Sequence, residues 1–222
     1  MPTALPALAG PPPVLFRDDD FVVLDKPAGL PVHAGPRGGA SVEDWFPLLS
    51  RRRTGPWLVH RLDADTSGCL VIALRRPALL AAQALFAAGQ VQKTYWAIVA
   101  GGPAEDSGVV DAPLLKRSRP GSWRMVVDPA GQAAQTSWVV RGRDAGRAWL
   151  ELHPATGRTH QVRAHCAHLG CAVLHDPVYG AADGGTLNLL ARAITLPLGR
   201  QLAAEAPPPP HMRAALRAFG CA

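Results

Sequence analysis

Residues 60–74, H-R-L-D-A-D-T-S-G-C-L-V-I-A-L, join a polar cluster directly to an unbroken apolar run. The run Cys69–Leu74 is typical of a buried strand, and polar groups at the entrance of such a strand must be paired or functional. Asp63 and Asp65 lie two positions apart, so an extended backbone would present both carboxylates on one face. By themselves these residues allow a carboxylate nucleophile, a carboxylate pair or a solvated turn.

Strand and helix patterns continue on both sides of this stretch. Phe21–Leu24 predicts a strand, and a Lys-Pro-Ala-Gly turn follows it closely. The pattern Ser41-x-x-Asp44 is typical of a capping box before a short helix. Pro77–Gly89 predicts a helix with proline near its start and glycine at its end. Val91–Val99 then predicts another strand.

The middle of the chain predicts antiparallel strands at Trp123–Val127, Gln135–Arg141 and Arg147–His153. The last two are joined by Asp-Ala-Gly at 144–146, which favours a hairpin. A helix is expected over about His160–Leu169, closed by a glycine. Strands with few intervening helices favour the α+β class with a mainly antiparallel sheet and flanking helices and loops.

The chain has 222 residues, enough for one large domain or two small ones. Residues 1–13 are rich in proline and alanine, which predicts a flexible lead-in. Residues 14–222 contain no repeat and no clear boundary, so we expect a single domain that ends in a short helix at Met212–Phe219. A hydrophobic fraction of 48% with 18% charged residues excludes a disordered chain.

The net charge of +6 and the pI of about 9.7 favour a polyanionic partner. No apolar stretch approaches the roughly 20 residues of a membrane span, and the first residues lack the pattern of a signal peptide. The four cysteines form no C-x-x-C pair, which favours reduced thiols. We therefore expect a cytoplasmic protein that does not contact membranes, and a monomer because no heptad pattern is present.

Three further segments accompany the nonapeptide at 60–68: D-K-P-A-G-L-P-V-H at 25–33, K-T-Y at 93–95 and G-R-T-H-Q-V-R at 157–163. Together and in this order they resemble the RluA-type pseudouridine synthases, whose hallmark is H-R-L-D-x-x-T-S-G. The resemblance covers about residues 21–196. It implies a pseudouridine-synthase-like catalytic domain that isomerises uridine in structured ribosomal or transfer RNA, without a cofactor or a metal.

The resemblance also implies three catalytic residues. Asp63 takes the place of the catalytic aspartate, which can attack C1′ of the sugar, assist deprotonation at C2′ or add to C6 of the base; the sequence leaves these routes open. Arg163 matches the arginine that pairs with this aspartate, and a guanidinium keeps its charge at any working pH. Tyr95 matches the tyrosine that stacks on the flipped target base and assists proton removal at C5.

Five more residues are expected to bind the substrate. Arg61 matches the motif arginine that acts in extruding the base, a step that costs on the order of a few kcal/mol. Lys93 is expected to support the pocket or a phosphate. The remaining three belong to the 157–163 segment: Arg158, His160 and Gln161. Asp65 occupies a variable motif position, so we interpret it as a surface or RNA-facing carboxylate.

Other readings remain open at this point. A non-catalytic RNA-binding or RNA-folding module could use the same pocket, and a glycosidase could use Asp63 with Asp65 if their carboxyl groups lie about 5–9 Å apart. Arg51-Arg52-Arg53 is either a solvated basic loop or a phosphate contact. The histidines between 153 and 175 show no recognisable zinc spacing. Leu190 stands where the resembled family often has a histidine.

Overall fold

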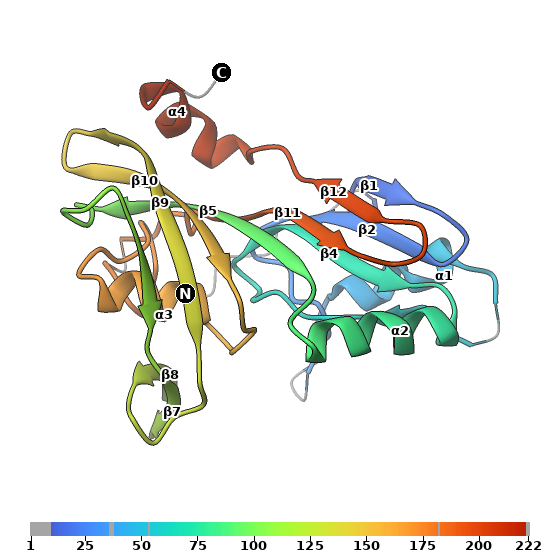
Figure 1. Ribbon diagram of the computed structural model, residues 1–222. Helices are drawn as coiled ribbons and strands as arrows, with labels where there is room; N and C mark the ends of the chain where they lie inside the picture. The colour runs from blue at the N-terminus through green and yellow to red at the C-terminus, as the bar shows by residue number, and fades with distance from the viewer. Residues whose placement is uncertain (1–9, 36–37, 53, 182, 221–222) are drawn as a thin grey trace. The chain divides into compact units, whose positions relative to one another are not determined.

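The chain forms two compact units in the computed structural model (Figure 1), which describes residues 10–35, 38–52, 54–181 and 183–220. Unit 1 comprises residues 1–92 and 191–207, and unit 2 comprises residues 93–190 and 208–222. The predicted lead-in falls mostly on residues 1–9, outside the described part of the chain. The prediction of a single domain over 14–222 stays a prediction.

The strands of unit 1 form a sheet in which β4 is central. In spatial order they are β1 (Val14–Arg17), β2 (Phe21–Lys26), β4 (Ser67–Ala73) and β11 (Leu189–Leu196), with β3 (Trp57–Leu58) paired to β4 and β12 (Leu202–Glu205) paired to β11. All seven residues of β4 are buried, as its apolar run predicts. The antiparallel register places Lys26 opposite Gly68. It therefore brings the 25–33 motif beside the nonapeptide.

Short helices cover this sheet. The predicted capping box is confirmed: the backbone N–H of Ser41 donates to the Asp44 carboxylate at 2.9 Å, before the 3₁₀ turn Val42–Trp45 and α1 (Phe46–Leu49). The predicted helix after β4 is also confirmed as α2 (Arg76–Ala87), which packs along β3 and β4 (Figure 1). It buries small alanine side chains, which allows a close approach to the sheet.

Unit 2 contains a second run of strands in the order β5 (Gln92–Ala100), β10 (Arg147–Pro154), β9 (Gln135–Asp144) and β6 (Ser107–Asp111), and a separate hairpin of β7 (Leu114–Arg119) and β8 (Ser122–Val127). The predicted strands in this region are confirmed, and β9 and β10 are antiparallel neighbours. Their turn uses positive φ at Ala145 (45°) and Gly146 (76°), which matches the right-handed twist of the hairpin. The predicted α+β class with a mainly antiparallel sheet is therefore confirmed.

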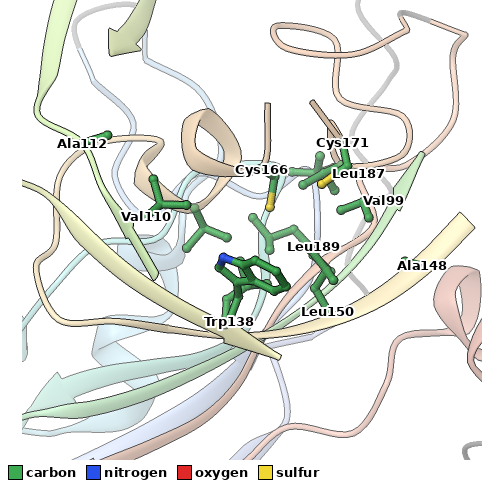
Figure 2. Close-up of a cluster of buried hydrophobic side chains, with 14 residues drawn as sticks. Val99, Val110, Ala112, Trp138, Ala148, Leu150, Cys166, Cys171, Leu187 and Leu189 are labelled. Carbon is green, nitrogen blue, oxygen red and sulfur yellow. The ribbon is translucent and has the colours of Figure 1, made fainter. Parts of the chain in front are cut away.

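Helix α3 (Gln161–His168) is held against this sheet by the core of unit 2 (Figure 2). Leu150 of β10 and Cys166 of α3 are fully buried there, and Trp138 of β9 lies between the sheet and the helix. Full burial of one such apolar side chain contributes about 1.5–3 kcal/mol. This packing fixes the orientation of α3 and of the motif residues at its start.

The predicted short helix at Met212–Phe219 is confirmed as α4 (Pro210–Ala218). Cys69, Cys166 and Cys171 are buried free thiols, and Cys221 lies outside the described residues. In the described segments, no helix combines the length and the apolar character that a membrane crossing requires.

Candidate active site

Asp63 opens a tight turn at the entrance of β4. Its carbonyl accepts the N–H of Thr66 at 3.1 Å, so Ala64 and Asp65 form the centre of the turn. Asp63 and Asp65 are half-buried. Gly68 follows with φ at 109°, a conformation that a side chain would strain. The glycine of the motif thus lets the chain pass from the turn into the buried strand.

Lys26 lies fully buried beneath this turn. Its ammonium donates to the carbonyls of Pro27 (2.9 Å), Leu30 (2.8 Å) and Ala64 (2.8 Å). The three N–H groups therefore match three acceptors. Burial lowers the pKa of Lys26 to about 7, while the charges of Asp65 and Asp63 raise it. Lys26 was not among the site residues expected from the sequence, although it belongs to the K-P-x-G-L motif that accompanies the nonapeptide.

The two residues before the turn have different surroundings. The ring of His60 accepts the N–H of Val71 through Nε2 at 3.1 Å and stacks on Phe86 with centroids 5.0 Å apart. It therefore ties the start of the nonapeptide to β4 and α2. Arg61 is exposed, with Nη1 3.4 Å from Nε2 of His33 in the neighbouring motif. The 25–33 motif and the nonapeptide thus share a polar surface on unit 1. The role of Arg61 in extruding the base stays a prediction.

In unit 2, Lys93 and Tyr95 lie on β5 and are half-buried. The ammonium of Lys93 donates to the carbonyl of Thr156 at 2.9 Å, and burial lowers its pKa to about 8. Tyr95 lies opposite Leu152 of β10 and packs against the core of unit 2. Its ring is therefore supported from one side by apolar side chains, and stacking on a base stays a prediction.

Arg163 is 2% exposed and forms a two-pronged ion pair with the fully buried Asp176. Its Nε and Nη2 each lie 2.8 Å from a carboxylate oxygen. Burial alone raises the pKa of Asp176, but hydrogen bonds and charge from Arg163, with the N–H groups of Val178 and Tyr179, outweigh it and lower the pKa. The carboxylate thus holds the guanidinium in a fixed plane. Asp176 was not among the site residues expected from the sequence, in which Arg163 was matched to Asp63.

Gln161 is 4% exposed, and its amide makes four hydrogen bonds within unit 2. The oxygen accepts from Thr156 Oγ1 at 2.7 Å and from the N–H of Arg158 at 2.9 Å. The nitrogen donates to the carbonyl of Gln135 at 2.9 Å and to Thr136 Oγ1 at 3.0 Å. With its amide satisfied, Gln161 supports the loop that precedes α3 rather than offering a free group to a ligand.

Its neighbours in the motif are more accessible. Arg158 is exposed, and its Nε donates to the carbonyl of Ala133 at 3.0 Å. His160 is half-buried with a left-handed backbone at φ 52°, and its ring lies 4.7 Å from that of Trp123 in β8. It precedes α3 rather than belonging to it. Thr156 accepts from Lys93 and donates to Gln161, so it joins the 93–95 and 157–163 motifs.

The buried His165 has a structural environment. Its Nε2 lies 3.1 Å from the carbonyl of Ala112, so this nitrogen carries the proton, and Nδ1 lies 2.8 Å from Thr136 Oγ1. Burial lowers its pKa. Across the described segments, no group of three or more His, Cys, Asp or Glu side chains is arranged to hold a metal ion. Leu190, in the place of the family histidine, is fully buried.

The residues expected at the site are divided between the two units. Unit 1 holds Asp63 and Arg61, and unit 2 holds Tyr95, Arg163 and the loop with Arg158. The pairing of Asp63 with Arg163 stays a prediction, as does the glycosidase pair of Asp63 with Asp65. Asp65 is half-buried and acts on the pKa of Lys26 more strongly than Asp63 does, which gives it an electrostatic role in the turn.

Comparisons with known proteins agree with the motifs. A family model described as RNA pseudouridylate synthase matches residues 20–168. The chain is 41% identical over 204 residues to an uncharacterized RNA pseudouridine synthase of Zymomonas mobilis, covering 88% of this chain and 93% of that protein. It is 36% identical over 167 residues to ribosomal large subunit pseudouridine synthase C of Vibrio cholerae, covering 75% of this chain and 52% of that protein.

A solved structure gives the same answer. The fold is similar to that of human RNA pseudouridylate synthase domain containing 4, with a TM-score of 0.79, 29% sequence identity and coverage of 93% of this chain and 92% of that chain. The family match includes the nonapeptide, the K-x-Y strand and the G-R-T-H-Q-x-R segment. The chain therefore belongs to the RluA-type RNA pseudouridine synthase family, represented here by its catalytic domain, and is an isomerase.

Proposed function

We propose that this protein isomerises specific uridines in structured ribosomal or transfer RNA to pseudouridine by flipping the target base. In this reaction the N1–C1′ bond breaks, the uracil turns in the pocket, and a C5–C1′ bond forms. The proton leaves C5 and N1 gains a proton, so the reaction needs no oxidant or reductant. We propose that no cofactor or metal takes part.

The observation that carries the proposal is the position of Asp63. Its turn stands at the entrance of a strand that is buried throughout, and the carbonyl of the next residue is held by the buried Lys26. Such anchoring keeps a carboxylate in one place while a base is moved past it. We assign the catalytic step to Asp63, by attack at C1′, deprotonation at C2′ or addition at C6.

The partners of Asp63 in the reaction come from unit 2. Arg163 supplies a permanent positive charge that keeps a nearby carboxylate ionised, and its pairing with Asp176 supports a fixed orientation. Tyr95 offers a ring for stacking on the flipped uracil and a hydroxyl for proton removal at C5. Arg61 fills the space that the extruded base leaves.

The loop before α3 is assigned to RNA binding. Arg158 is exposed and His160 is half-buried, so their side chains are available for phosphates or sugars of the substrate. Lys93 supports this loop through its hydrogen bond to the carbonyl of Thr156. Gln161 acts through its hydrogen bonds by holding this loop. The name of the Vibrio cholerae relative supports ribosomal RNA as the substrate class. A cytoplasmic location and a monomeric state complete the proposal.

Tritium release from RNA labelled at C5 of uridine tests the proposal. The wild-type protein is expected to release tritium from total RNA of cells that lack this gene, and Asp63→Asn is expected to bind that RNA without releasing tritium. Asp65→Asn serves as the matched control and is expected to retain activity. Release by Asp63→Asn would overturn the catalytic assignment. Binding without release by the wild type would favour the RNA-binding module instead.

A further inference from the structure

Unit 1 contains a second feature at the far end of β4. The nonapeptide leads into the start of this strand, and Leu74, which directly follows its end, lines a cavity of about 650 Å³. The seven residues of β4 span about 20 Å at roughly 3.3 Å per residue. The cavity is therefore separated from Asp63 by about the length of the strand, and its volume falls within the range of ligand-binding pockets, about 300–1,000 Å³.

The rim of the cavity carries four arginines from three parts of the chain: Arg52 follows α1, Arg75 and Arg76 begin α2, and Arg200 lies between β11 and β12. All four are exposed. Arg75 pairs with Asp20 at 3.4 Å. Within the described segments, no ion pair engages the other three. Their guanidinium groups thus keep their donors for a ligand outside the protein.

The acidic residues of the lining do not neutralise this rim. Asp18 accepts the N–H groups of Asp20 and Phe21 at 2.8 and 2.7 Å, so its carboxylate is used in the turn between β1 and β2. With Asp20 occupied by Arg75, the charged lining keeps a formal charge of +2, from four arginines and two aspartates. An anion at the rim would therefore be attracted.

Apolar side chains line the same cavity. Phe21 and Leu74 are buried, and the half-buried Trp57 lines the same cavity. The indole of Trp57 packs against Gly55, where φ is 78° and any Cβ would collide with the ring. A lining that contains exposed arginines, an indole and buried apolar side chains combines the two elements of nucleotide recognition, phosphate forks and a surface for a base.

We propose that this cavity, the distal arginine pocket, binds a nucleotide of the RNA substrate remote from the uridine that is isomerised. Arg76 and Arg200 contact its phosphates, and Trp57 with the apolar side chains of the lining contacts its base or sugar. The inference rests on the proposed function for the identity of the RNA. The proposal gives one residue of the basic run at 51–53 a role in RNA binding, because Arg52 lines the cavity. Arg53 lies outside the described residues.

The physical consequence is a second anchor for a folded RNA. When RNA binds, each phosphate that an arginine contacts releases the counterions condensed on it. Each such contact makes the slope of log affinity against log salt steeper by about 0.7 for single strands. Loss of both contacts is expected to make the slope less steep by about 1.4. When the salt concentration rises from about 0.05 to about 0.2 M, affinity for RNA falls in both proteins, and the factor by which it falls would be about sevenfold smaller for the variant than for the wild type.

The test compares Arg76→Gln/Arg200→Gln with Arg213→Gln/Arg217→Gln. The control removes the same charge from exposed positions of α4. Apparent affinity for total RNA from cells that lack the gene is measured across the salt range. Deuterium exchange of segments 74–81 and 198–200 is followed with and without that RNA. The pocket variant alone is expected to lose slope, and both segments of the wild type are expected to be protected.

Equal slopes in the pocket variant and the wild type, or equal losses in both variants, overturn the inference. Titration with uridine monophosphate and with inorganic phosphate separates a site for free anions from an RNA site. Saturable binding of either probe with an unchanged RNA slope also overturns it. Tritium release is measured in parallel. If the wild type releases tritium and the salt slopes of wild type and pocket variant are equal, only the pocket inference is refuted. If the wild type releases no tritium, the proposed function is refuted, and the comparison of salt slopes still tests the pocket.

Discussion

Replacement of Lys26 by methionine is expected to destabilise the protein by an amount that depends on pH. Methionine keeps most of the volume of the side chain but removes all three donors. The carbonyls of Pro27, Leu30 and Ala64 then lose their shared partner. A buried acceptor without a partner costs about 1–3 kcal/mol. The carbonyl of Ala64 still accepts the N–H of Gly29 at 2.9 Å, so the carbonyls of Pro27 and Leu30 account for the loss, about 4 kcal/mol together.

A second contribution opposes this cost. The pKa of Lys26 is about 7 in the folded chain and 10.5 ordinarily, so the unfolded chain binds more protons between these values. The resulting penalty on the wild type is complete below about pH 7 and disappears as the pH rises towards 10.5. It amounts to about 4 kcal/mol at pH 7 and about 2 kcal/mol at pH 9. The variant escapes this penalty, so its net destabilisation is expected to grow from about 0 kcal/mol at pH 7 to about 2 kcal/mol at pH 9.

Urea unfolding of both proteins at the two pH values, followed by circular dichroism, measures the difference in the free energy of unfolding. Contributions from other titrating groups cancel between wild type and variant. Lys116→Met is the control, because Lys116 is exposed on β7 and is not removed from water by folding. If the difference caused by Lys26→Met changes by less than about 0.5 kcal/mol between the two pH values, the reasoning from burial is refuted.

Three further changes test other parts of the structure. Asp176→Asn breaks the buried ion pair with the Arg163 guanidinium and is expected to cost about 3–5 kcal/mol by urea unfolding; a cost no larger than that of Asp183→Asn, at an exposed pair, would contradict this. Gln161→Leu removes four hydrogen bonds and is expected to cost about 2–4 kcal/mol and to raise KM for RNA more than it lowers kcat; an unchanged Tm would argue against its supporting role. Ala145→Gly relieves a left-handed alanine and is expected to raise stability by about 1 kcal/mol; a lower Tm would show that the turn is not strained.

Much of the fold could be predicted from local patterns. The apolar run after the nonapeptide is buried along its whole length, and the helix with proline at its start and the hairpin at 144–146 form where expected. The strand Leu114–Arg119 could not be predicted, because L-L-K-R-S-R has the composition of a solvated loop. It becomes a strand by pairing with Ser122–Val127. Strand pairing between segments of this kind depends on the partner and not on either sequence alone.

The candidate site divides in the same way. The motifs predicted Asp63, Tyr95 and Arg163 through residue type and order, but not what surrounds them. The fully buried Lys26 was not expected beneath the Asp63 turn, since buried lysines are rare and their partners are backbone carbonyls that no sequence pattern identifies. Gln161 was expected to bind the substrate, but its amide is satisfied within unit 2. Two of its four hydrogen bonds go to Gln135 and Thr136 of β9, which no local pattern places beside it.

The sequence by itself determined the chemistry that this protein carries and the family to which it belongs, because motifs of fixed spacing specify local turns and side chains. Only the tertiary structure decided how those side chains are charged and held. One acceptor of the Lys26 ammonium, the carbonyl of Ala64, lies 38 positions away, and the carboxylate of Asp176 that pairs with Arg163 lies 13 positions away. Burial, which lowers the pKa of Lys26, arises when distant segments pack together. The distal arginine pocket has the same origin, since strand pairing gathers its arginines from segments that show no common motif.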